Sequence, residues 1–135
     1  MNRKSIFILI LFFLLVILTT ITLLYNKKQE NILNYSLNNK QYKLLIADTP
    51  EKWAKGLMFF RKPDQGVDGM IFLFPNKQER SFWNKNTYMD LDIYWLDDEK
   101  IVGKSYLPSI EKSKEIVIVN SSQPVNKVIE LLVNH

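Results

Sequence analysis

Residues 82–96 gather most of the side chains that could do chemistry. The segment reads Phe-Trp-Asn-Lys-Asn-Thr-Tyr-Met-Asp-Leu-Asp-Ile-Tyr-Trp-Leu. Asp90 and Asp92 stand two residues apart, so on a strand their side chains share one face with bases about 6–7 Å apart. Carboxylate pairs at roughly this separation act as acid and base in glycoside hydrolysis. An exposed strand face that simply carries charge gives the same pattern, and no second catalytic element accompanies the pair.

Most other catalytic chemistries lack their residues. The chain has no cysteine, which excludes thiol catalysis, thiolate metal sites and disulfides. The one histidine is His135, at the end of the sequence, where a side chain is usually mobile. A serine triad therefore lacks its base. The acids Asp90, Asp92, Asp97, Asp98 and Glu99 could surround a hard cation, but their spacing matches no calcium loop, so we expect neither a metal site nor a cofactor.

The same segment also has the features of a binding site. Lys85-Asn86-Thr87 is polar and turn-prone, which predicts a loop ahead of a strand. Aromatic rings near such a loop can stack on a sugar or a peptide side chain, although rings of this kind more often belong to the core. We expect Trp95 in the core and keep Trp83 as a candidate. The candidate ligand-binding residues are Arg61, Trp83, Lys85, Asn86, Thr87 and Asp92, and Asp92 is also the candidate catalytic residue.

Alternation along the strand predicts which side chains it buries. Met89, Leu91, Ile93 and Trp95 point one way, and Asp90, Asp92 and Tyr94 the other. Asp92 therefore either lines an open groove or is locked in a buried pair with Arg61 or Lys85. We favour the groove.

An apolar segment precedes the folded part. Ser5 to Leu24 carries no charge and is long enough to cross a bilayer. It exceeds the usual apolar region of a signal peptide, about 7–15 residues, and no Ala-x-Ala pattern follows it. We therefore predict an uncleaved anchor in the lipid bilayer of the cytoplasmic membrane; the alternative is a cleaved signal and a secreted domain. Arg3 and Lys4 favour a cytoplasmic N-terminus, with the C-terminal domain outside.

The remaining sequence predicts one mostly β domain with short α-helices, antiparallel and barrel-like or sandwich-like. We divide the chain into an anchor (1–25), a linker (26–34) and the domain (35–135). Expected elements are a hairpin turning at Asn38-Asn39, a helix beginning at Asp48-Thr49-Pro50-Glu51, a strand over 70–74, a hairpin loop over 97–99, a strand over 116–119 and a helix after Pro124. Val125, Val128, Ile129 and Leu132 would form the apolar side of that last helix.

The charge balance argues against a nucleic-acid partner. The chain carries a net charge of +4, and Arg3 and Lys4 supply two of these charges ahead of the span. All 14 acidic residues follow the span, so the domain is nearly neutral with both signs interspersed. That is a solvated protein surface rather than a basic footprint.

Three blocks of residues resemble a known family. They are Gly56-Leu57-Met58-Phe59-Phe60-Arg61, then Gly69-Met70-Ile71-Phe72-Leu73-Phe74, then Trp83-Asn84-Lys85-Asn86-Thr87-Tyr88-Met89-Asp90-Leu91-Asp92-Ile93. In this order they resemble the domain of unknown function 192 family. The resemblance implies a compact β-rich domain, commonly exported or membrane-anchored, with no established activity. Asn84 stands where the family has methionine and Asp90 where it has proline, so the resemblance assigns Asp90 no shared role.

Three classes of function remain open on this sequence. The first, which we favour, is an extracytoplasmic binding module for an envelope glycan, a peptide or a partner protein. The second is a hydrolase that uses Asp92, with Lys85 or Arg61 stabilising charge. The third is a structural component of a membrane assembly, which would present a flat, exposed apolar patch.

Overall fold

The computed structural model describes residues 2–29, 32–61 and 66–133. It divides into two compact units, residues 1–32 and 33–135. The elements in chain order are α1 (Arg3–Gln29), β1 (Ile32–Leu37), β2 (Lys40–Ala47), α2 (Pro50–Lys55), β3 (Gly69–Gln78), β4 (Ser81–Trp83), β5 (Leu91–Asp97), β6 (Lys100–Leu107), α3 (Ile110–Ser113), β7 (Ile118–Asn120) and β8 (Val125–Leu132).

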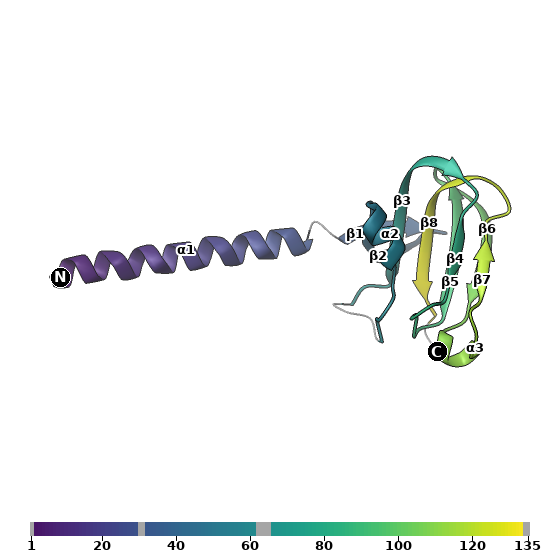
Figure 1. The fold of residues 1–135 in the computed structure, drawn as a ribbon. Coiled ribbons are helices and arrows are strands. Elements are labelled where there is room, and N and C mark those ends of the chain that lie inside the picture. Colours follow the sequence, from purple (N-terminus) through teal and green to yellow (C-terminus); the bar gives the residue numbers. More distant parts are fainter. Residues whose placement is uncertain (1, 30–31, 62–65, 134–135) are drawn as a thin grey trace. The chain divides into compact units, whose positions relative to one another are not determined.

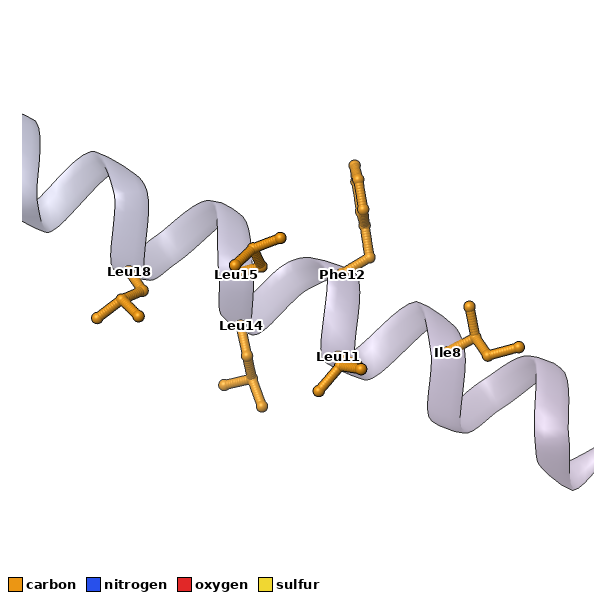
Figure 2. Close-up of a pocket in the computed structure, with 6 residues that line it drawn as sticks. All are labelled: Ile8, Leu11, Phe12, Leu14, Leu15 and Leu18. Carbon is orange, nitrogen blue, oxygen red and sulfur yellow. The ribbon is translucent and has the colours of Figure 1, made fainter.

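The first unit is the long apolar helix α1. Its segment Arg3–Leu24 has a mean hydropathy of 3.1, and none of it is buried. Figure 2 shows apolar side chains that project from successive turns of this helix and leave only open surface between them: Ile8, Leu11, Phe12, Leu14, Leu15 and Leu18. Such a helix fits either a membrane anchor or a signal sequence.

The segment predicted as a linker has more structure than we expected. Residues 26–29 continue α1 and residues 32–34 already belong to β1, while residues 30 and 31 lie outside the described part of the chain. Lysine and glutamine are good helix formers, so a helix that has begun in the apolar span can extend into this polar stretch.

The second unit is built on one six-stranded sheet in the order β1-β2-β3-β8-β5-β6. Figure 1 shows β8, the last strand in the sequence, lying between β3 and β5. Every pair with a described register is antiparallel except β2–β3, where α2 lies in the crossover between two parallel strands. A separate two-stranded sheet pairs β4 with β7. The prediction of a mostly β domain is confirmed, and the sheet does not close into a barrel.

The six-stranded sheet buries both of its faces. On one face a cluster that includes Phe72, Ile93 and Trp95 packs against Trp53 from α2 and Phe82 from β4. The opposite face holds a second cluster that includes Leu44, Ile71 and Ile129. Alternation along each strand assigns neighbouring residues to the two clusters in turn. We call the first of these the Phe72 face and the second the Ile71 face.

The predicted final helix is wrong. Residues 125–132 form β8, which pairs with both β3 and β5 and is buried on both faces. A strand of this kind is apolar nearly throughout, because neither side meets water, and it has no clear two-residue period. Val125, Val128, Ile129 and Leu132 also fit a helical spacing, and a short apolar run cannot distinguish the two by periodicity alone.

The turns, loops and helix start that short sequence motifs predict are present in the described part of the chain. The turn at Asn38 and Asn39 has positive φ at both residues, as a two-residue hairpin requires. Thr49 caps α2, because its side-chain oxygen accepts a hydrogen bond from the backbone N–H of Lys52 at 3.4 Å. The predicted hairpin loop lies between β5 and β6, and residues 85–87 are a loop as predicted. The sequence Arg61-Lys62-Pro63-Asp64-Gln65-Gly66 also predicts a turn, which falls mostly on residues 62–65, outside the described residues.

Candidate functional site

A groove runs between α2 and β4 on the Phe72 face of the sheet. Its cavity volume is about 430 Å³. Half of its lining residues are aromatic: the ring centres of Trp53 and Phe74 lie 5.0 Å apart, and Phe82 and Trp83 come from β4. The complete lining is Trp53, Ala54, Phe74, Glu79, Arg80, Ser81, Phe82 and Trp83. We call this cavity the α2–β4 groove.

A smaller recess adjoins the groove and shares Trp53, Ala54, Phe82 and Trp83 with it. Its volume is about 30 Å³, enough room for a group the size of a water molecule. Its other lining residues are Lys55, Gly56, Leu57, Met58, Phe72, Thr87 and Glu130. We call it the Glu130 recess, because that carboxyl group is its most unusual feature.

Glu130 projects from the middle of β8 onto the Phe72 face. In the sheet it pairs with Met70 on one side and Ile93 on the other, both apolar. The residue is 5% exposed, and its Oε2 has no hydrogen-bond partner among the described residues. Burial raises the pKa of the Glu130 carboxyl to about 8, because removing the ionised form from water is unfavourable. The recess therefore holds a protonated carboxylic acid at neutral pH.

Gly56 leaves the space above this carboxyl open. It ends α2 with φ 48° and ψ −138°, a conformation that side chains strongly disfavour. A Cβ atom here would lie 3.3 Å from Cζ of Phe72 and 3.7 Å from Oε2 of Glu130. The glycine thus ends the helix and lets the side chains of Phe72 and Glu130 approach closely.

The three sequence blocks converge on the Glu130 recess. Gly56, Leu57 and Met58 come from the first block, Phe72 from the second, and Trp83 and Thr87 from the third. A backbone hydrogen bond of 2.8 Å from the N–H of Phe59 to the carbonyl of Asn86 ties the first block to the third. Both residues have positive φ, so this junction consists of two tight turns.

Arg80 lies at the groove. Its guanidinium stacks over the ring of Phe74 at 3.8 Å, and Nη2 donates to the backbone carbonyl and the side-chain oxygen of Asn76 at 3.0 and 2.9 Å. Its Nε is buried and has no hydrogen-bond partner among the described residues. Desolvation by burial lowers the pKa of Arg80. Neither Arg80 nor Glu130 was singled out from the sequence.

The predicted binding residues near the loop are only partly brought together. Trp83 borders both cavities and is 46% exposed, and Thr87 lines the recess. Lys85 lies 5.1 Å from the centre of the Trp83 ring. Asn86 accepts the backbone bond described above and does not line either cavity. Arg61 lies over Tyr88 at 4.0 Å and pairs with Glu111, away from both cavities.

Asp92 is not part of this site. Its side chain lies on the Ile71 face of β5, opposite the face that carries Glu130, and it pairs with Nζ of Lys104 at 2.8 Å. Its side chain is 30% exposed, so neither the open groove nor a buried pair with Arg61 or Lys85 describes it. The hydrolytic arrangement of Asp92 with either of those cations is not assembled in this structure.

Asp90 and Asn84 bond to residues of the segment 106–117, which includes α3 and its flanking loops. Asp90 accepts hydrogen bonds from the Tyr106 hydroxyl at 2.6 Å and the Ser109 backbone at 2.8 Å, and pairs with Lys112. Asn84 is fully buried; its amide donates to the Pro108 carbonyl at 3.0 Å and accepts from the Val117 backbone at 2.8 Å. Both positions that depart from the family pattern therefore have structural partners here.

Within the described residues, no group of three or more histidine, aspartate or glutamate side chains could hold a metal ion. The acids considered from the sequence for a hard cation each pair with a lysine instead: Asp90 with Lys112, Asp92 with Lys104, Asp97 and Asp98 both with Lys77, and Glu99 with Lys127. What the groove and the adjoining recess together offer chemically is stacking on aromatic rings, the neutral carboxylic acid of Glu130 in the recess and the partly buried guanidinium of Arg80 in the groove.

Comparison with known proteins places the chain in a family. The model of DUF192, described as an uncharacterized ACR, matches residues 32–134. The chain belongs to the DUF192 family. No curated protein matches the chain significantly.

Two crystal structures share the fold of this DUF192 domain. One is a chain from Sinorhizobium meliloti 1021, provisionally designated a transcription regulator, with 26% identity and a TM-score of 0.60; the match covers 76% of this chain and 77% of that one. The other, from Novosphingobium aromaticivorans DSM 12444, is of unknown function, with 23% identity and the same TM-score of 0.60; the match covers 75% and 73%. The second likeness shows the fold alone.

Proposed function

We propose that this DUF192 domain is a binding module and that the α2–β4 groove is its ligand site. The observation that carries the proposal is the groove itself. Its volume of about 430 Å³ falls in the range typical of ligand pockets, roughly 300–1,000 Å³. Half of its lining residues are aromatic, and Glu79, Arg80 and Ser81 supply polar groups, a combination that suits a ligand pocket. An envelope glycan or a peptide could stack on Trp53 and Trp83.

The apolar helix fits into this proposal as an anchor that holds the module outside the cytoplasmic membrane. Its support is the exposed apolar segment Arg3–Leu24 with positive residues ahead of it. N-terminal sequencing of the membrane fraction tests the anchor. The proposal predicts a chain that retains its first residues, whereas a mature start between Leu24 and Glu30 would show a cleaved signal.

A thermal-shift screen of the full chain in detergent micelles tests the binding function. The probes are N-acetylglucosamine oligomers and short peptides, since a ligand of the native state raises the unfolding midpoint. The variant Ala54→Trp fills the groove from the exposed side of α2, and Trp83→Ala removes one wall. We expect both variants to lose the shift. The control Ile118→Ala changes an exposed residue outside the groove and should keep it.

A role as a component of a membrane assembly has one observation in its favour. Trp83, Ile116 and Ile118 are 46%, 50% and 57% exposed, and Trp83 pairs with Ile118 between β4 and β7. Neighbouring exposed apolar side chains can mark a protein interface. If the domain docks through this sheet, Ile118→Ala should weaken its recovery in a crosslinked assembly, while Ala54→Trp should not.

A further inference from the structure

Two buried polar atoms without partners among the described residues belong to residues that line two cavities with four lining residues in common. They are Oε2 of Glu130 in the recess and Nε of Arg80, whose side chain lines the groove. The third such atom among the described residues, Oδ1 of Asp97, lies 2.5 Å from Nζ of Lys77 and so has a cation beside it. Buried polar groups are almost always paired, and each exception calls for an explanation.

The two unpaired atoms, Oε2 of Glu130 and Nε of Arg80, require opposite kinds of partner. A carboxyl oxygen accepts hydrogen bonds and, when ionised, attracts a cation, whereas a guanidinium nitrogen only donates and attracts an anion. Water could satisfy either one, but a single ligand that carries both a cation and an anion would satisfy both at once. From these observations, and resting on the binding function proposed above, we infer that the site takes a short peptide whose primary ammonium group enters the Glu130 recess and whose carboxylate meets Arg80.

The surroundings of Glu130 suit an ammonium group. The recess, about 30 Å³, has room for a group the size of water. The rings of Phe72, Phe82 and Trp83 line it, and aromatic faces attract cations. The strands on either side present only Met70 and Ile93 toward the carboxyl. Lys55, exposed on α2, is the one other charged residue in the described lining.

Binding of the ammonium group should release a proton. Glu130 is protonated in the empty recess at neutral pH and must ionise to form an ion pair with the incoming cation. The carboxylic proton leaves to the buffer, the ligand remains an ammonium ion, and no covalent bond between the partners forms. A ligand that entered as a neutral hydrogen-bonding group would release none.

The test is calorimetric titration of the full chain in micelles with oligoglycines of two to six residues, at pH 6.5, in two buffers of different ionisation enthalpy. Several peptide lengths are used so that at least one of them can reach from the Glu130 carboxyl to the Arg80 guanidinium. Each peptide is compared with its N-acetylated form, which lacks the ammonium group, and with its C-terminal amide, which lacks the carboxylate. We expect at least one length to bind, to release close to one proton, and to lose tenfold or more in affinity with either blocking group.

Variants assign these effects to the two residues. In Glu130→Gln, proton release should disappear and N-acetylation should no longer matter; in Arg80→Gln, amidation should no longer matter. The control Asp92→Asn removes an acid on the opposite face and should behave as wild type. Equal binding of free and N-acetylated peptides would overturn the ammonium assignment while leaving the groove a binding site. Binding of N-acetylglucosamine oligomers alone would overturn the peptide assignment. If no probe binds or shifts the midpoint, the proposed function fails too.

Discussion

Glu130 should make the stability of this domain depend on pH in a specific window. Its pKa is raised from 4.5 to about 8 in the folded state by burial. Below pH 4.5 the carboxyl is protonated in both states, and its favourable contribution to folding is fully present. As pH rises from 4.5 to 8, the unfolded state ionises and the folded state does not, so stability falls by about 1.4 kcal/mol per pH unit. Above pH 8 the loss levels off.

The size of the effect follows from the displacement of the pKa. A shift from 4.5 to about 8 corresponds to roughly 5 kcal/mol, an upper figure because water can enter the recess. The variant Glu130→Gln keeps the shape and remains neutral at every pH. It should therefore match wild type near pH 4.5 and exceed it by several kcal/mol at pH 8.5.

Urea unfolding between pH 4.5 and 8.5 measures this difference. Tryptophan fluorescence reports the domain alone, because Trp53, Trp83 and Trp95 all lie in residues 33–135. The matched control is Glu79→Gln, an exposed acid at the groove, which should follow the wild-type curve. Parallel curves for wild type and Glu130→Gln, at unchanged m-values, would refute the claim that Glu130 is a buried protonated acid.

Three further substitutions should change stability by different amounts in the same urea assay. Gly56→Ala should lower the free energy of unfolding by about 1–3 kcal/mol, because Gly56 has a positive φ and an added Cβ would crowd the Phe72 ring. An unchanged urea midpoint would contradict this close packing of Gly56 at the recess. Asn84→Met should lower the free energy of unfolding by about 3 kcal/mol, because it leaves the Val117 N–H and the Pro108 carbonyl without their hydrogen bonds to Asn84. An unchanged free energy of unfolding would show that the loop repacks. Asp92→Asn should change the free energy of unfolding by no more than about 0.5 kcal/mol, since its pair with Lys104 is partly exposed; a loss of several kcal/mol would contradict this placement.

Much of the fold could be predicted from local signals. The Asn38-Asn39 turn, the Thr49 cap and the alternation of β5 depend on neighbouring residues alone, so the sequence contains all the information they need. Whether residues 125–132 form a strand or a helix cannot be decided from neighbouring residues alone. A strand in the middle of a sheet acquires its neighbours from distant segments, and the spacing of Val125, Val128, Ile129 and Leu132 fits a helix as well.

The same distinction explains which parts of the site were predicted. Alternation correctly placed Asp92 opposite Leu91 and Ile93, but it cannot say which face other elements will cover to make a groove. The predicted final helix gave no reason to single out Glu130 as buried. A signal did exist: a single acid stands between Ile129 and Leu131 in an otherwise apolar run, and such an acid is rarely buried without a reason.

The three indole N–H groups offer the most direct test that the α2–β4 groove is the ligand site. Trp53 and Trp83 line the groove, whereas Trp95 is 2% exposed and donates to Ser105 at 2.9 Å within the core. In ¹⁵N-indole-labelled full chain, titrated with whichever probe raises the unfolding midpoint most, the Trp53 and Trp83 signals should move with a common saturation curve. The Trp95 signal should move far less. Saturable binding that leaves Trp53 and Trp83 unmoved would place the ligand elsewhere and contradict the account.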